Sequence, residues 1–308
     1  MIAGIDIGGT TSKIGLVLDG RVLRQTRIPT TGHADDHAFA QALATAVRSL
    51  LADEGGGSLE AVGIGAPNAN QFTGIIEMAP NLPWKHDVPL ARMLQDRLNV
   101  PAVLGNDANA AALGEWRYGA GKGYDDLLVV TIGTGVGSGF IVNGSLLLGS
   151  AGNAGELGHM TLAMDGRPCT CGRKGCLEAY VSIRGMRQTY AELANDLDLL
   201  KEEGVKCIAD AAHAGDRAAQ RTFEETVHWL AVGLANAVAV TGPRRVVLFG
   251  GIVRSGDLLL APLKKAFHSA LLNIYQGRVD LTVSALPDDD AALLGAAALT
   301  TIPMKIRK

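Results

Sequence analysis

The chain has 308 residues, enough for two domains, and its hydrophobic residues (47%), charged residues (19%) and 39 glycines are typical of an α/β protein with many tight turns. Its formal net charge of −3 provides no basic surface for nucleic acid or for an anionic membrane. The sequence has no run near the roughly 18 apolar residues of a membrane span and no signal peptide at its N-terminus, so we expect a cytoplasmic protein that binds neither partner.

The N-terminal segment predicts a hairpin with a glycine-rich turn. An apolar strand at 2–8 contains Asp6, the sequence Gly-Gly-Thr-Thr occupies 8–11, and a second strand follows at 13–18. Backbone N–H groups and hydroxyls in such a turn suit a phosphate, and the nearby carboxylate suits a metal ion. The same residues also fit a plain hairpin turn, so the motif alone leaves both interpretations open.

Polar residues follow the next two predicted strands. After the strand at 61–66, a loop at 67–83 contains Asn68 and Asn81, which either bind a polar ligand or satisfy their own turns. The strand at 100–104 continues into Asn106 and Asp107, and a helix is expected at 108–116. A helix N-cap accounts for one of these two side chains. The other lies where α/β folds usually place ligands, at the carboxyl end of a strand.

A second glycine-rich segment repeats the layout of the first. Strands are expected at 127–132 and 140–142, with the sequence Gly-Thr-Gly-Val-Gly-Ser-Gly at 133–139 between them. This loop does not satisfy G-x-G-x-x-G, and Trp116 excludes a P-loop ending at Lys122. The two hairpins together indicate a duplicated nucleotide-binding frame whose turns face one phosphate chain.

The other expected elements follow from apolar periodicity and turn residues. Strands are predicted at 22–28, 245–249 and 280–285, and helices at 36–54, 87–98, 183–194, 205–214, 217–241, from Gly251 to about 272, and 288–299. Cys207 lies on a predicted helix and is expected to be a small core residue.

The segment 151–180 concentrates metal-binding and acidic side chains. His159, Cys169, Cys171 and Cys176 have the composition of a closed, four-coordinate zinc site, and the alternative is three reduced cysteines without a metal. Glu156 and Glu178 flank these residues. Taken singly each acid fits an exposed position, whereas together with Asn106 and Asp107 they suit the hydroxyls of a sugar.

These residues carry a resemblance to the ROK family of sugar kinases and related repressors. It rests on D-I-G-G-T from Asp6, N-D-A from Asn106, G-T-G from Gly133, E-L-G-H-M from Glu156 and C-x-C-G-x-x-G-C-x-E from Cys169. The similarity covers essentially the whole chain. Within the family, the run GIGAPNANQFTG and the following APNLPW resemble bacterial glucokinases most.

The resemblance implies a role for individual residues. Asp107 would be the general base that takes the proton of a sugar 6-hydroxyl, and ATP would be the phosphoryl donor with Mg²⁺. Sugar hydroxyls would be bound by Asn81, Asn106, Glu156, His159 and Glu178. Phosphates and Mg²⁺ would be held by Asp6, Gly8, Gly9, Thr10, Thr11, Lys13, Thr134 and Gly135, with Gly250 and Gly251 beside adenosine. Many family members read G-G-T-K, so the longer spacing to Lys13 leaves its phosphate contact open.

The resemblance also implies a two-lobed α/β fold, actin-like and hexokinase-like, with a structural zinc site in the larger lobe. The smaller lobe would comprise 1–105 joined by a C-terminal helix at 289–308, and the larger 106–288 with the zinc-binding segment 159–176. The expected activity is ATP-dependent phosphorylation of glucose, with N-acetylmannosamine, N-acetylglucosamine or fructose as alternative substrates. A homodimer or homotetramer is expected. A sugar-responsive repressor is disfavoured because no helix-turn-helix domain precedes the first strand.

Overall fold

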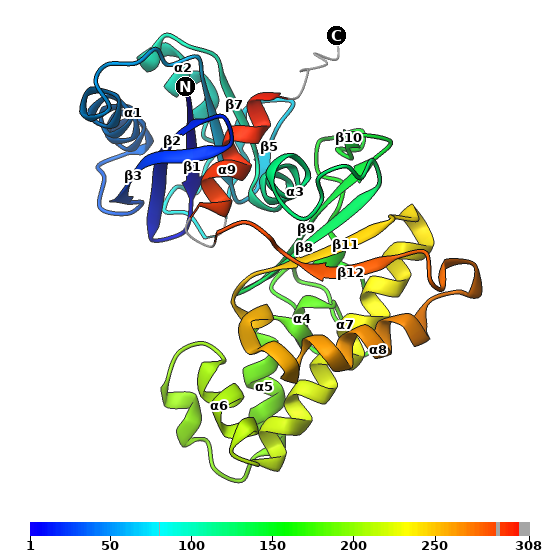
Figure 1. The fold of residues 1–308 in the computed structure, drawn as a ribbon. Helices are drawn as coiled ribbons and strands as arrows, with labels where there is room; N and C mark the ends of the chain where they lie inside the picture. Colours follow the sequence, from blue (N-terminus) through cyan, green and yellow to red (C-terminus); the bar gives the residue numbers. More distant parts are fainter. Residues whose placement is uncertain (80, 288–289, 302–308) are drawn as a thin grey trace.

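The computed structural model describes residues 1–79, 81–287 and 290–301. Two five-stranded sheets dominate the fold, and each has the same arrangement (Figure 1). In both sheets three antiparallel strands occupy one side, and two further strands continue the sheet parallel to the third. The repeated topology agrees with the duplicated frame that the two glycine-rich hairpins predict. Within the described residues no helix is both long and apolar enough to cross a membrane.

The N-terminal sheet has the strand order β3-β2-β1-β4-β7. Its strands are β1 (Ile2–Ile7), β2 (Thr11–Leu18), β3 (Arg21–Pro29), β4 (Ala61–Ala66) and β7 (Ala102–Asn106), and a small hairpin of β5 (Ala69–Asn70) and β6 (Ile75–Ile76) follows β4. One face is covered by α1 (Asp36–Asp53) and α2 (Leu90–Leu98), whose apolar sides form one core with Ile5 and Ile64.

The opposite face of this sheet is unusually flat because glycine replaces larger residues there. Successive side chains of a strand alternate between faces, so Gly4 and Gly63 lie on the face opposite Ile5 and Ile64. This is where α9 (Ala291–Ala298) packs, and a Cβ at Gly63 would collide with the carbonyl oxygen of Ala296. The C-terminal helix α9 therefore packs directly against the backbone of the N-terminal sheet.

The second sheet has the order β10-β9-β8-β11-β12. Its strands are β8 (Leu127–Ile132), β9 (Val136–Val142), β10 (Ser145–Leu146), β11 (Arg245–Phe249) and β12 (Asp280–Val283). The helices that pack with it into one core are α4 (Glu178–Val181), α5 (Ile183–Leu193), α6 (Lys206–His213), α7 (Arg217–Thr241) and α8 (Leu260–Ala270). Short 3₁₀ turns occupy Leu157–His159, Asp198–Lys201, Gly251–Leu258, Asn273–Tyr275 and Leu299–Thr301.

Two helices fill the space between the sheets. The helix α3 (Asp107–Tyr118) shares a core with Val103 of β7, Val129 of β8 and Leu299 after α9. Figure 1 shows α3 and α9 side by side between the two halves. A Cβ at Gly114 would lie 3.0 Å from the Cα of Gly295, so small residues allow the two helices to cross closely.

Several predicted boundaries are wrong, and each has a local cause. The strand predicted at 100–104 runs as β7 from Ala102 to Asn106, and β9 begins at Val136, so the second glycine-rich turn is only three residues long. The helix predicted from 87 begins at Leu90 because Pro89 precedes it. Gly256, with φ of 59°, breaks the helix predicted after Gly251. The C-terminal helix is described only over 291–301, and residues 289 and 302–308 of that prediction lie outside the described residues.

Candidate active site

Asn106 and Asp107 mark the junction between β7 and α3. Asn106 is the N-cap of the helix, and its Oδ1 accepts hydrogen bonds from the backbone N–H groups of Ala108 at 2.9 Å and Asn109 at 3.3 Å. Its amide group remains available to a ligand. Asp107 accepts a bond from the N–H of Ala108 at 2.8 Å and is otherwise open to water. The N-cap role therefore accounts for Asn106, whereas Asp107 makes one backbone contact and is exposed to water.

Asp107 lies close to Asp6, which faces Lys13 across the β1–β2 pair. Burial raises the pKa of Asp6 to about 6; the negative charge of Asp107 adds to this shift and Lys13 opposes it. Burial also raises the pKa of Asp107, against the hydrogen bonds from the backbone. Water reaches Asp107, so solvent screens part of this effect. Two repelling carboxylates form a place where a cation is favoured.

A polar cavity of about 240 Å³ lies beside this junction. Amide and carboxylate groups from both halves of the chain surround it, and the residues that line it are Asn68, Ala69, Glu77, Asn106, Asn109, Ser138, Gly152, Asn153, Ala154 and Glu156. Asn68, Asn106 and Glu156 therefore share one cavity, whereas Asn81, His159 and Glu178 are not among the residues that line it. It is rich in hydrogen-bonding groups of the kind that recognise sugar hydroxyls.

The sequence interpretation missed four polar residues of this cavity, Glu77, Asn109, Ser138 and Asn153. Asn109 is 4% exposed, and its Oδ1 has no hydrogen-bond partner among the described residues. Its position three residues after Asn106, in the first turn of α3, was a usable signal because residues i and i+3 share a helix face. For Glu77 and Asn153, which lie in the loops on either side of the cavity, no sequence signal pointed to a shared site.

Glu156 and Glu178 flank residues 159–176, the zinc-binding segment of the sequence analysis, which is called the cysteine segment below. Burial raises the pKa of Glu156; His159 opposes the shift, and the charges of Asp107 and Glu178 add to it. Glu178 is buried at the start of α4. Its Oε2 accepts a bond from the N–H of Val136 at 3.0 Å, and its Oε1 accepts one from the hydroxyl of Thr170 at 3.1 Å. Glu178 is therefore fixed between the second sheet and the cysteine segment.

The predicted metal ligands converge. One ligand atom each from His159, Cys169, Cys171 and Cys176 lies within 4.8 Å of the others. The Cys169 Sγ is 3.6 Å from His159 Nδ1, and the Cys171 Sγ is 3.7 Å from Cys176 Sγ. A tetrahedral zinc ion with its usual bond lengths separates two sulfurs by about 3.8 Å and a sulfur and a nitrogen by about 3.5 Å. The donor set and these spacings fit zinc, and His159 would keep Nε2 for another partner.

The two glycine-rich turns lie against other predicted site residues. A Cβ at Gly9 would lie 2.9 Å from the carbonyl oxygen of Asn81, and one at Gly135 would lie 2.7 Å from Glu178 Oε2. Thr10, Thr11 and Thr134 are exposed, as phosphate-binding hydroxyls must be. Gly250 has φ of 118° and a Cβ there would collide with the carbonyl oxygen of Ile132, so this turn contacts the end of β8, while Gly251 is exposed.

Comparison with known proteins identifies the family of the chain. The chain is 35% identical to a glucokinase of Thermotoga maritima, over 97% of this chain and 96% of that one. A ROK family glucokinase from Streptomyces griseus, solved with glucose and AMPPNP, has a TM-score of 0.79 at 35% identity, covering 97% and 98% of the two chains. A ROK hexokinase from Thermus thermophilus has a TM-score of 0.81, also at 35% identity, over 97% of each chain. The ROK family model matches residues 2–302. The chain belongs to the ROK family and has its α/β sugar kinase fold.

Proposed function

We propose that this protein is an ATP-dependent hexose kinase whose substrate is glucose. The observation that carries the proposal is the place of Asp107, a water-accessible carboxylate with a raised pKa at the end of β7. It adjoins a cavity lined by amides and carboxylates. The Streptomyces griseus relative, solved with glucose and an ATP analogue, supports the same pair of ligands here.

In the proposed reaction Asp107 is the general base. The 6-hydroxyl oxygen of the sugar attacks the γ-phosphorus of ATP, the bond from that phosphorus to the β,γ-bridging oxygen breaks, and ADP leaves. The hydroxyl proton passes to Asp107, whose raised pKa makes it a better acceptor than an ordinary carboxylate. Asn81, Asn106, Glu156, His159 and Glu178 would orient the sugar, because ordered hydroxyls bring the attacking oxygen in line.

The two hairpin turns would bind the nucleotide. The exposed hydroxyls of Thr10, Thr11 and Thr134 in these turns suit phosphate oxygens, and Gly250 and Gly251 would lie beside adenosine. Asp6 would hold Mg²⁺, which neutralises phosphate charge when bound. Lys13 lies near enough to Asp6 to lower the pKa of that carboxyl, so it has a partner in the chain besides any phosphate.

The cysteine segment would bind a structural zinc ion. Four protein ligands leave no open position, so we assign the metal no part in the chemistry. Its effect would be to fix the backbone from His159 to Cys176, and with it the residues that follow Cys176. Residues 1–105 with the C-terminal helix, and residues 106–288, would act as two lobes whose closure excludes water from the sugar.

A coupled assay for ADP tests the proposal. Asp107→Asn should lower kcat for glucose by at least about 100-fold, as expected for loss of a general base, with sugar affinity retained. Asp53→Asn, an exposed change at the end of α1, is the control and should leave kcat unchanged. A variant of Asp107 that keeps most of its turnover contradicts the assigned base.

A panel of sugars tests the substrate. Wild-type protein should phosphorylate glucose with a higher kcat/KM than fructose, N-acetylglucosamine or N-acetylmannosamine. A clearly higher value for an N-acetyl sugar would reassign the substrate while leaving the kinase reaction intact.

A further inference from the structure

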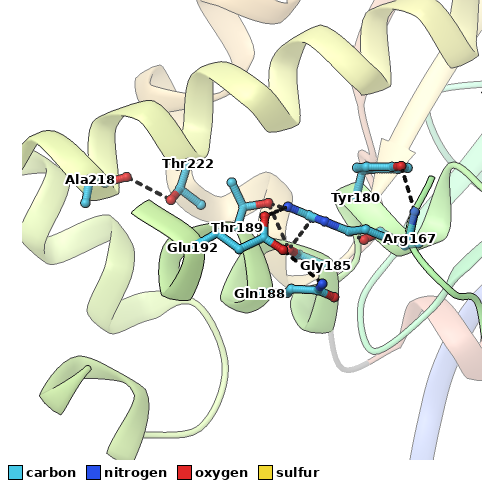
Figure 2. Close-up of polar contacts among 9 residues, drawn as sticks. Arg167, Tyr180, Gly185, Gln188, Thr189, Glu192, Ala218 and Thr222 are labelled. Carbon is cyan, nitrogen blue, oxygen red and sulfur yellow. Dashed lines mark hydrogen bonds and ion pairs between the residues drawn. The ribbon is translucent and has the colours of Figure 1, made fainter. Parts of the chain in front are cut away.

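Arg167 lies two residues before the first cysteine ligand, and its side chain does not point into the cavity or the cysteine cluster. Figure 2 shows the side chain turned toward Gly185, Thr189 and Glu192 of α5. The side chain is 15% exposed. The residues that it contacts there are Ala179, Tyr180, Gly185, Thr189 and Glu192. A charged residue that is this enclosed needs a reason for its position.

The guanidinium group makes a branched set of contacts. Its Nη1 donates to the hydroxyl of Thr189 at 2.9 Å and approaches the carbonyl oxygens of Gly185 at 3.3 Å and Ala179 at 3.4 Å. Its Nη2 forms an ion pair with Glu192 at 2.5 Å. Thr189 in turn donates to Gly185, which closes the network within the first turns of α5.

The backbone of Arg167 is held on both sides as well. Its N–H donates to the hydroxyl of Tyr180 at 3.0 Å, and its carbonyl oxygen accepts the N–H of Gly175 at 2.8 Å. The guanidinium also lies 5.0 Å from the centre of the Tyr180 ring, which stacks on Trp229 of α7 at 4.3 Å. Arg167 therefore joins the base of the cysteine segment to α4, α5 and, through Tyr180, α7.

The contacts of Arg167 affect the position of Glu178. The helix α4 is one turn long, has no side-chain N-cap and begins with Glu178, so contacts with its neighbours determine where it lies. One oxygen of Glu178 is bound by Thr170 of the cysteine segment and the other by Val136 of β9. A small displacement of the segment against α4 would separate Thr170 from Glu178, so that the carboxylate would be held only from β9, by Val136, and could change direction.

We propose that Arg167 is a positioning residue for the hexose site. It fixes the cysteine segment against α4 and α5, and thereby sets the direction of the Glu178 carboxylate. Arginine suits this role because one nitrogen of its planar fork reaches two carbonyls and a hydroxyl at a fixed distance from the stem, whereas lysine offers a compact charge on a flexible stem. The inference depends on the proposed function, in which Glu178 binds the sugar.

The test compares Arg167→Lys with two control variants. Glu192→Gln removes only the half-exposed ion-pair partner and leaves the bonds to Thr189, Gly185 and Ala179. Arg184→Gln changes an exposed arginine of α5, the helix that also carries Glu192. Arg167→Lys should raise KM for glucose about tenfold, as expected for loss of more than one hydrogen bond in a positioning network, with KM for ATP and bound zinc unchanged. Both controls should match the wild-type protein.

Two further measurements separate positioning from general stabilisation. Added ethylguanidine should lower KM for glucose in Arg167→Ala by refilling the vacated site. Thr189→Val, which removes a buried partner of Arg167, should raise KM for glucose in the same direction even if both Arg167 variants fail to fold. Equal rises in KM for glucose and ATP, or an unchanged KM for glucose in folded Arg167→Lys, would overturn the inference.

Hydrogen exchange of residues 169–178 without substrates distinguishes the two proposals. Faster exchange is expected in Arg167→Lys and not in Glu192→Gln. If the wild-type protein phosphorylates no hexose while this exchange difference appears, the proposed function fails and the role of Arg167 in holding the segment stands. If the exchange does not differ, the positioning role fails whatever the activity.

Discussion

Replacing Asp6 with asparagine should stabilise the protein while impairing it as a kinase. The pKa of Asp6 is raised from 3.8 to about 6, chiefly by burial, with Asp107 adding to the shift. Because the folded pKa exceeds the unfolded one, the folded chain binds the proton more tightly, and stability falls as the pH rises from about 3.8 to 6. At about 1.4 kcal/mol per pKa unit, ionised Asp6 lowers the free energy of unfolding by about 3 kcal/mol at pH 7.

The pH dependence of this difference identifies its cause. By the same relation, Asp6 lowers the free energy of unfolding by about 1.6 kcal/mol at pH 5. The stability gained by Asp6→Asn should therefore be about 1.4 kcal/mol smaller at pH 5 than at pH 7. Urea unfolding of the protein without substrates, followed by tryptophan fluorescence at the two pH values, measures both differences. These figures are upper values, because an asparagine amide in the same place also needs hydrogen-bond partners.

Two results would refute this reasoning. A gain in stability that is the same at pH 5 and pH 7 would mean that the titration of Asp6 is not its source. A loss of stability at pH 7 would mean that the carboxylate has partners that compensate its burial. Asp257→Asn, at an exposed carboxylate, is the matched control and should change the free energy of unfolding by less than about 0.5 kcal/mol at either pH.

Two further predictions concern the metal segment and the C-terminal helix. Cys171→Ser should lower bound zinc, measured by atomic absorption, and weaken glucose binding and stability together; loss of turnover with zinc and sugar binding intact would contradict a structural metal. Gly63→Ala should destabilise the fold by about 2 kcal/mol or more in thermal unfolding, because its Cβ would collide with the Ala296 carbonyl. A neutral result there would mean that α9 can move away from β4 without cost.

The glycine-rich hairpins and the cluster of His159 with three cysteines were predictable because their signals are local. The turn at 8–11 and the turn at 133–135 each follow an apolar strand, and their repetition indicated the duplicated topology that both sheets share. His159 and Cys176, at the ends of the metal segment, are 17 positions apart, and three cysteines within eight residues left few interpretations other than a metal site. Short-range spacing carries such information because the chain between the residues limits where they can lie.

The cavity and its supporting contacts could not be predicted in the same way. Asn153 and Asn68 line one cavity although 85 positions separate them, and only the packing of the two halves brings them together. The sequence does not distinguish Arg167 from an exposed arginine, because the residues near it in the chain do not identify Thr189 or Gly185 as its partners. Contacts of this kind depend on how the helices pack, which apolar periodicity specifies only in part.

The sequence by itself indicated the repeated hairpins, the clustering of His159 with three cysteines and the resemblance to the family, because each rests on short motifs of neighbouring residues. Only the tertiary structure decided that Asn106 caps α3 while Asp107 is exposed to water. It also decided that α9 packs against the backbone of β4, and that Glu178 is held between Val136 and Thr170. The physical reason is that burial, charge interactions and hydrogen-bond partners are set by atoms brought together from distant parts of the chain, so the chemistry of a carboxylate is fixed only once the fold surrounds it.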